Sequence, residues 1–260
     1  MTAPRPTVLC LSGHDPGGGA GIQADIETVL SLGGHAVSLI TAHTVQDSSN
    51  VTRVQAADAS LLREQAETVL ADVQVRALKI GLLGDPGQAG FIASLIERSG
   101  APVVLDPVLR AGGGATLASR ALIDEIKRVL LPLTEVLTPN AAEARVLSGA
   151  DNPEAAGAAL LALGARNVLV TGGDEPGEPV INRWYRRGGS PRAFSWPRLP
   201  GPFHGAGCTL AAAIATLLAR GWTVGEALAD AQAYVHSALQ RAHAPGRGRL
   251  IPGRGPGTAP

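Results

Sequence analysis

Short apolar segments typical of buried β-strands alternate with longer amphipathic segments along most of this 260-residue chain. The strand-like segments cover residues 8–11, 35–41, 51–55, 77–80, 103–105, 136–138 and 168–171. The helix-like segments between them cover residues 21–32, 60–71, 88–98, 119–129, 141–147 and 153–163. Such alternation predicts βαβ units, which build a mostly parallel sheet with helices on both faces. The expected fold class is therefore α/β.

The last third of the chain departs from this alternation. Residues 178–200 contain short β-like runs around Gly188-Gly189, which predict an antiparallel hairpin at a sheet edge. Two long helices are expected over residues 204–220 and 224–241. The Gly-, Pro- and Arg-rich tail that follows is expected to be flexible from about residue 253. No internal repeat or interdomain linker is visible, so we expect one domain over residues 1–260.

The charge balance and the cysteine usage argue against several classes of protein. The 22 basic and 22 acidic side chains give a formal net charge of zero, which does not indicate a nucleic-acid partner. The two cysteines, Cys10 and Cys208, form no CxxC pair, so zinc binding and thioredoxin-like redox chemistry are not expected. Few cysteines are typical of a reducing compartment, and no apolar stretch approaches the length of a membrane span. We therefore expect a cytoplasmic protein with no membrane partner.

A glycine-rich segment at residues 12–25 follows the first expected strand and opens a helix. Its glycines allow backbone N–H groups to approach a ligand closely, and a helix N-terminus favours anions. The segment lacks the GxxxxGK[ST] pattern and is therefore no Walker loop. Asp25 lies one turn into this helix, where a carboxylate can hydrogen-bond a polar ligand. A solvated helix carboxylate is an equally good interpretation of Asp25.

A second glycine-rich turn runs directly into an alanine-rich helix, at Gly205-Ala206-Gly207-Cys208. The N–H groups from Ala206 to Thr209 are expected to point at one spot, where the helix dipole adds positive potential. Such an anion hole suits a phosphoryl group during its transfer. We expect the helix N-terminus to lower the thiol pKa of Cys208, so that Cys208 acts as a base toward a substrate hydroxyl. The alternative is a small buried apolar side chain.

Two further groups of polar residues lie just after expected strands. Asn140 and Glu143 share one face of a helix start and offer oxygen ligands to Mg²⁺ held through water. Capping of the helix by the same two residues is the alternative. Asp106 ends the strand at residues 103–105, at the edge where α/β enzymes bind ligands, and it suits either the metal or a turn before proline. Arg110 is expected to stabilise phosphate charge.

In this order and spacing, the segments resemble the hydroxymethylpyrimidine/phosphomethylpyrimidine kinases of thiamin biosynthesis, which belong to the ribokinase-like superfamily. The resemblance covers residues 8–252. The Asp-Pro-x-Gly-Gly-Ala-Gly-Ile-Gln-Ala-Asp and His-Gly-x-Gly-Cys-Thr-Leu strings are its most specific parts. The matching text is Gly13-x-Asp15-Pro16-x-Gly18-Gly19-Ala20-Gly21-Ile22-Gln23-Ala24-Asp25, Thr41-Ala42-x-x-x-Gln46, Lys79-Ile80-Gly81-Leu82-Leu83, Leu105-Asp106-Pro107-Val108, Thr138-Pro139-Asn140-x-x-Glu143-Ala144 and His204-Gly205-x-Gly207-Cys208-Thr209-Leu210.

The resemblance implies a ribokinase-like three-layer α/β/α sandwich, usually a homodimer, that uses ATP and Mg²⁺. It implies 4-amino-5-hydroxymethyl-2-methylpyrimidine, and then its monophosphate, as substrates. The implied pyrimidine-binding residues are Gly13, Asp25, Thr44, Gln46, Leu82 and Val108. The implied Mg–ATP side consists of Asp106, Arg110, Asn140, Glu143 and Thr171, with Asp106 and Glu143 serving the metal. The implied catalytic turn is Gly205, Ala206, Gly207 and Cys208, with Cys208 at the position that carries Asp in sugar kinases.

The chain departs from many family members at three places where they carry lysine. Here those places read Leu109-Arg110-Ala111-Gly112-Gly113, Thr171-Gly172-Gly173 and Gln232. Three potential phosphate-contacting cations are thus absent, which bears most on the second phosphorylation.

Two alternatives remain open at this stage. One is a pyridoxal or pyridoxine kinase, since that vitamer also carries a hydroxymethyl group on a nitrogen ring. The other is a non-catalytic pyrimidine-binding protein. Gln46 favours the aminopyrimidine, because a carboxamide offers both a donor and an acceptor.

Overall fold

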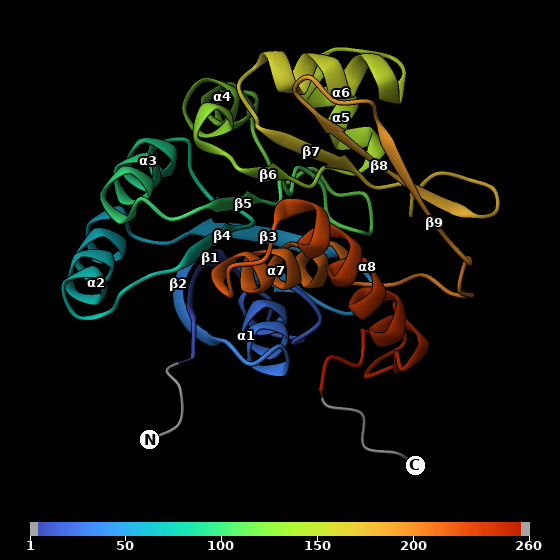
Figure 1. The fold of residues 1–260 in the computed structure, drawn as a ribbon. Coiled ribbons are helices and arrows are strands. Elements are labelled where there is room, and N and C mark those ends of the chain that lie inside the picture. Colours follow the sequence, from blue (N-terminus) through green and yellow to red (C-terminus); the bar gives the residue numbers. More distant parts are fainter. Residues whose placement is uncertain (1–4, 256–260) are drawn as a thin grey trace.

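The computed structural model describes residues 5–255, in which one nine-stranded sheet forms the centre of the molecule (Figure 1). The strand order is β3-β2-β1-β4-β5-β6-β7-β8-β9. Strands β2, β1, β4, β5, β6 and β7 run parallel, whereas β3, β8 and β9 are each antiparallel to the preceding neighbour. The strands are β1 (Thr7–His14), β2 (His35–Gln46), β3 (Val51–Ala56), β4 (Ala77–Ile80), β5 (Val103–Leu105), β6 (Val136–Leu137), β7 (Asn167–Val170), β8 (Val180–Arg186) and β9 (Arg192–Trp196).

Helices cover both faces of this sheet (Figure 1). One face carries α2 (Ala59–Asp72), α3 (Gly87–Ser99), α4 (Arg120–Glu125), α5 (Ala141–Ser148) and α6 (Pro153–Ala162), and the other carries α1 (Gly21–Ser31), α7 (Ala206–Ala219) and α8 (Val224–Gln240). Successive side chains of β1 point to opposite faces of the sheet. Leu9 and Leu11 therefore pack in the hydrophobic core under α2 to α6, whereas Val8 and Cys10 pack in the core under α1, α7 and α8. The predicted ribokinase-like α/β sandwich is confirmed.

The expected strands and helices are present, with boundaries that differ by a few residues. The hairpin predicted at residues 178–200 is formed by β8 and β9 around the Gly188-Gly189 turn. The helix expected over residues 119–129 is irregular instead: α4 continues into a π-helical turn, Ile126–Leu130, and a 3₁₀ turn, Leu131–Leu133. Pro132 lies in that last turn, and because it has no backbone N–H it cannot extend an α-helix.

The C-terminal tail is more ordered than its composition suggested. Residues 243–254 form a strap that is held by bridges from His243 to Ile251 and from Phe203 to Leu250. Its residue Arg254 contacts both glycine-rich turns. Arg254 is buried, so the expectation of a flexible tail from about residue 253 is wrong for Gly253 and Arg254. Residues 256–260 lie outside the described part. None of the helices between residues 5 and 255 has the length and apolar character that crossing a membrane requires.

Candidate active site

A cavity of about 710 Å³ lies at the carboxyl ends of the parallel strands, between the two glycine-rich turns. Every site residue predicted from the sequence lines this cavity except Asp25. The lining residues of the prediction are Gly13, Thr44, Gln46, Leu82, Val108, Asp106, Arg110, Asn140, Glu143, Thr171, Gly205, Ala206, Gly207 and Cys208. They come from separate chain segments, which meet here because parallel strands end at one edge of the sheet.

One end of the cavity is narrow and mostly apolar. Gly13 is the next-to-last residue of β1 and packs against Leu82; a Cβ at Gly13 would lie 2.8 Å from Leu82 Cδ2, so a larger residue there would require the Leu82 side chain to move. The Thr44 hydroxyl donates to the His14 carbonyl at 2.8 Å, which fixes the end of β2 beside β1. Gln46 presents a carboxamide at the same end. This end therefore suits a small flat ring with polar substituents.

The first glycine-rich turn wraps around the carboxylate of Asp15. Asp15 accepts hydrogen bonds from the N–H groups of Gly17, Gly19 and Ala20 and contacts His204 Nε2 at 2.8 Å. Burial opposes ionisation, but hydrogen bonds with His204, Gln46 and the Gly17 N–H outweigh it and lower the pKa of Asp15 to about 2. The expectation that the N–H groups of this turn face a ligand is wrong for these three residues, because Asp15 occupies them.

The second glycine-rich turn opens α7 toward the cavity. Gly205 caps the helix at φ 87°, a left-handed conformation that glycine adopts without strain. The first N–H groups of a helix have no partner within it, and Ala206, Gly207 and Cys208 line the cavity at that point. The Thr209 N–H bonds instead to the Gly205 carbonyl at 2.9 Å. The predicted anion hole thus has three candidate N–H donors, and Thr209 is not one of them.

The thiol of Cys208 is held in its protonated form. Burial raises its pKa to about 12; nearby Lys79 acts in the opposite direction, and the carboxylates of Asp106 and Asp25 raise the pKa further. The prediction of a lowered thiol pKa is therefore wrong, because the helix N-terminus does not outweigh desolvation beside carboxylates. Cys208 also forms a side-chain hydrogen bond with Asp106.

Asp106 and Glu143 are neighbouring acidic residues that line the cavity, with Asp106 beside the N-terminus of α7. Burial, followed by the charge of Asp106, raises the pKa of Glu143 to about 8, and burial also raises the pKa of Asp106. Glu143 accepts from the Leu109 and Asn140 N–H groups, at 3.2 and 3.0 Å, and Asn140 caps α5 in return. Asn140 and Glu143 thus cap α5 as the alternative interpretation expected, and Glu143 lines the cavity together with Asp106 as well.

Asp25 lies below the cavity and does not reach it. Its side chain is fully buried, 2.8 Å from Lys79 Nζ, and it accepts a 2.6 Å hydrogen bond from the Ser12 hydroxyl. Burial would lower the pKa of Lys79, but Asp25 more than offsets this and keeps the ammonium charged. Direct contact between Asp25 and a substrate is therefore not supported by its position.

The wide end of the cavity lies beside β8, β9 and α8. Gln232, at a position where the sequence resemblance implies lysine, is buried and accepts hydrogen bonds from Asn182 and Trp196, at 2.8 and 3.2 Å. Asn182 in turn accepts from the Gly172 N–H at 2.9 Å. A neutral amide network thus replaces a cation here. Arg110 lines the mouth of the cavity.

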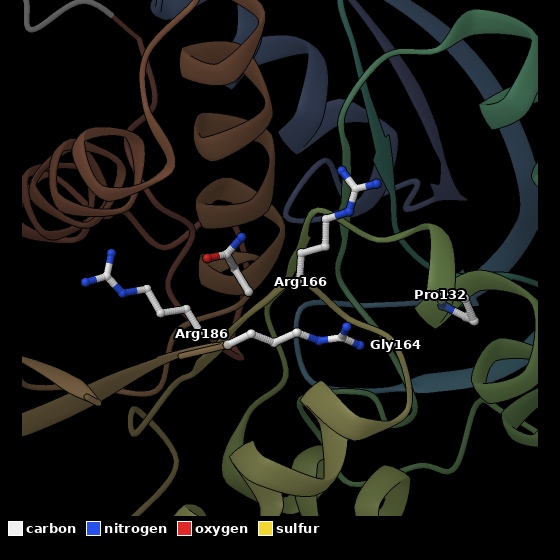
Figure 2. Close-up of a pocket in the computed structure, with 6 residues that line it drawn as sticks. Pro132, Gly164, Arg166 and Arg186 are labelled. Carbon is white, nitrogen blue, oxygen red and sulfur yellow. The ribbon is translucent and has the colours of Figure 1, made fainter. Parts of the chain in front are cut away.

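A second hollow lies at the opposite end of the strands, near the start of β7 and the end of β8. It is lined by Pro132, Gly164, Arg166, Asn167, Arg186 and Arg187 (Figure 2). Its guanidinium groups point in different directions (Figure 2). Arg166 pairs with Glu135 at 2.9 Å, and Arg187 donates to the Leu161 carbonyl at 3.2 Å. These side chains serve the fold and do not converge on a ligand.

Three polar residues of this region, the buried Asp15 and Lys79 and the half-buried His204, were quoted in the motifs but given no role by sequence reasoning. Their positions in the glycine-rich string, the Lys-Ile-Gly string and the turn before α7 were the available signal. Nothing in the sequence pointed to Arg254, since the composition of the tail favoured disorder.

The fold and the cavity define a small-molecule kinase of the ribokinase-like α/β class: buried carboxylates and a helix N-terminus line one cavity at the carboxyl ends of the parallel strands. The family model described as phosphomethylpyrimidine kinase matches residues 15–252, and the chain belongs to this family.

Relatives and solved structures agree with that assignment. The hydroxymethylpyrimidine/phosphomethylpyrimidine kinase of Rhizobium meliloti is 39% identical over 264 residues, which cover 95% of this chain and 94% of that protein. The thiamine biosynthesis bifunctional protein ThiED of Geobacter sulfurreducens is 39% identical over 252 residues, 94% of this chain, which spans only 51% of that longer protein.

Two solved structures share the fold. The ADP complex of Bacillus subtilis pyridoxal kinase has a TM-score of 0.88 and 29% identity, covering 95% of this chain and 97% of that one. The phosphomethylpyrimidine kinase of Clostridium difficile has a TM-score of 0.79 and 29% identity, covering 90% of this chain and all (100%) of that one.

Proposed function

We propose that this kinase transfers a phosphoryl group from ATP to 4-amino-5-hydroxymethyl-2-methylpyrimidine and then phosphorylates the monophosphate. The observation that carries the proposal is the convergence of the predicted pyrimidine, nucleotide and catalytic residues on one cavity, with Asp25 as the exception. Relatives that carry the corresponding name cover nearly the full length of this chain, which supports the same conclusion.

The pyrimidine binds at the narrow end in this proposal. Gln46 supplies a donor and an acceptor to the adjacent amino group and ring nitrogen of the substrate. Gly13, Leu82 and Val108 form the flat apolar walls of the ring site, and the Thr44 main chain closes its edge. A substrate that left the carboxamide of Gln46 without partners would bind poorly, because unpaired buried polar groups are costly.

The nucleotide phosphates lie between Asp106, Arg110, Asn140 and Thr171. Asp106 and Glu143 would hold a magnesium ion through water, because a nearby cation would stabilise the ionised form of two neighbouring buried carboxylates whose pKa values are raised. Both oxygens of Glu143 already accept backbone N–H groups, which favours contact through water over direct coordination. Bound Mg²⁺ would neutralise charge on the phosphates.

Transfer requires positioning more than covalent chemistry from the protein. The N–H groups of Ala206, Gly207 and Cys208 receive the charge that develops on the transferred group. The substrate hydroxyl lies near the Cys208 thiol, which remains protonated and holds Asp106 by a hydrogen bond. In this proposal Asp106 is the carboxylate that accepts the departing proton, and Cys208 positions it.

Product analysis by mass spectrometry tests the proposal. Purified protein and Mg–ATP are incubated with the hydroxymethylpyrimidine, with Gln46→Ala as a variant that should lose pyrimidine affinity while nucleotide binding persists. Pyrimidine diphosphate is the expected product. Monophosphate alone would restrict the function to the first step, as the absence of lysine at Arg110, Thr171 and Gln232 allows. No phosphorylated pyrimidine would contradict the proposal.

A pyridoxal kinase is the second candidate, and one observation favours it. Solved pyridoxal kinases of Bacillus subtilis and Staphylococcus aureus reach TM-scores of 0.88 and 0.89 with this chain, above the 0.79 of the phosphomethylpyrimidine kinase. A parallel reaction with pyridoxal decides between the two. Pyridoxal phosphate as the sole product would assign the enzyme to that vitamer.

We further propose a homodimer in the cytoplasm. The two cysteines are free, which suits a reducing compartment, and Val45 on β2 is 49% exposed beside the edge strand β3. An apolar side chain at a sheet edge is a natural contact for a second copy.

A further inference from the structure

The C-terminal strap places a buried arginine between the two glycine-rich turns of the active site. The side chain of Arg254 is fully buried, and its guanidinium contacts both turns. Nη2 donates to the Gly19 carbonyl, and Nη1 lies 3.5 Å from the Gly18 carbonyl. Nε donates to the Thr209 hydroxyl at 2.8 Å. One side chain thus joins the turn at residues 15–21 to the first turn of α7.

The contact with Thr209 continues into the anion hole. The Thr209 hydroxyl that accepts from Arg254 donates to the Gly205 carbonyl at 2.7 Å. Gly205 is the residue that caps α7 in the left-handed conformation, and a Cβ there would collide with the Gly19 carbonyl. The two turns therefore touch at Gly19 and Gly205, and Arg254 lies beside this point of contact.

Among the described residues, Arg254 forms an ion pair with Glu27, and its charge also acts on the buried carboxylate of Asp25. Nη1 pairs with Glu27 at 3.0 Å, and Glu27 is held in turn by Gln23 at 2.7 Å. A buried guanidinium is costly unless its donors are satisfied, and here backbone carbonyls and one hydroxyl take most of them. The planar, forked shape of the group suits this set of acceptors, which a lysine ammonium cannot reach together.

Both joined segments carry atoms of the reactive centre. Asp15 in the first turn contacts His204 at 2.8 Å, and His204 directly precedes Gly205; the Gly21 N–H of the first turn also lies close enough to Cys208 to act on its thiol pKa. A relative shift of the two turns would therefore move the thiol and the N–H donors together. Resting on the proposed kinase function, we propose that Arg254 is a positioning residue that sets the register between the glycine-rich turn and the anion hole.

The test compares Arg254→Ala and Arg254→Lys with the matched control Arg241→Ala. Arg241 also holds the strap, through a 3.0 Å bond to the Gly253 carbonyl and a bond to Ser237, but it is exposed and contacts neither turn. In Arg254→Ala we expect kcat to fall about 100-fold with only a small change in KM, since a misplacement of about 1 Å costs roughly this much. Arg241→Ala should keep kcat within about twofold.

Hydrogen exchange supplies a readout that does not depend on activity. The amides of residues 17–21 and 206–209 should exchange faster in Arg254→Ala than in the parent protein, while those of the central strands stay protected. Arg254→Lys keeps the pair with Glu27 and is expected to fold, with an intermediate loss of kcat, so it decides the matter should the alanine variant unfold.

Each contrary result is distinct. Parent-like kcat in a folded Arg254→Ala or Arg254→Lys variant would overturn the proposal. So would an equal loss in Arg241→Ala, because the effect would then come from a loosened strap in general. A parent protein that phosphorylates no substrate would contradict the kinase function. In that case hydrogen exchange alone tests the positioning role, and unchanged exchange at the two turns in Arg254→Ala would reject it.

Discussion

At the scale of single residues, local surroundings reversed an expectation that the backbone had suggested. A cysteine at a helix N-terminus is expected to ionise more easily. Cys208 does not, because it is desolvated and lies near Asp106 and Asp25, and together these effects raise its thiol pKa to about 12. Its neighbours in space decide the charge, and none of them is adjacent in the sequence.

The raised pKa of Cys208 leads to a test of its role. Because its pKa in the folded protein is about 12, against an ordinary value of 9.0, the thiol remains neutral from pH 6 to 9 and contributes no pH dependence to kcat in that range. Cys208→Ser keeps a hydroxyl donor for Asp106 and should retain kcat within about tenfold, with the pH profile unchanged; Cys208→Ala should lose more. A thiolate base would instead show a rate that rises with pH, and the serine variant would abolish that rise.

At the scale of elements, a buried ion pair ties helix α1 to strand β4 beneath the active site. Lys79 on β4 donates to Asp25 on α1 and also to the Ser12 hydroxyl on β1, at 2.9 Å. The pair also lies close enough to Cys208 and Asp106 to affect their pKa values. We interpret Asp25 as a support for the floor of the site and not as a ligand of the substrate.

Removing one member of this pair should cost stability and not pyrimidine affinity. Asp25→Asn leaves the Lys79 charge buried without its counterion, which is expected to lower the free energy of unfolding by about 3 to 5 kcal/mol in urea titrations. Asp124→Asn is the matched control, since its pair with Arg120 is exposed and should contribute less than about 1 kcal/mol.

The same variant separates the two interpretations of Asp25. A folded Asp25→Asn protein should bind the pyrimidine as the parent does, whereas Gln46→Ala should not. Calorimetric titration with the pyrimidine measures both. Loss of pyrimidine binding in Asp25→Asn, with stability unchanged, would restore Asp25 as a substrate ligand.

At the scale of the whole molecule, the ends of the sheet differ from its centre. The central parallel strands are buried between helices, whereas β3 and β9 are the edge strands among residues 5–255. The C-terminal strap also contributes to the cavity, because Arg249 lines it and donates to the Phe203 and Gly112 carbonyls. The ordered tail therefore belongs to the architecture of the site.

The proposed homodimer gives a prediction at this scale. If the edge at β2 and β3 is the contact, Val45→Lys should shift the protein from dimer to monomer in sedimentation equilibrium at micromolar concentration. Val146→Lys is the control, because Val146 on α5 is exposed to a similar extent, 47% against 49%. A parent protein that sediments as a monomer would contradict the dimer itself; a dimer that survives Val45→Lys would place the contact elsewhere.

The sequence by itself determined the α/β class, the order of strands and helices and the predicted site residues, all of which line the cavity except Asp25. The periodicity of apolar residues and the positions of turn residues are local signals, so they predict strands and helices without knowledge of the tertiary structure. It also supplied the family, because the strings around Asp15 and Cys208 are specific. The capping of α5 by Asn140 and Glu143 followed from spacing alone.

Only the tertiary structure decided what these residues are able to do. It placed Asp25 against Lys79, gave the N–H groups of the first glycine-rich turn to Asp15 and kept Cys208 protonated. It also buried Arg254 between the two turns. The physical reason is that burial and charge pairing depend on partners far apart in the chain, and ionisation follows the summed effect of those partners.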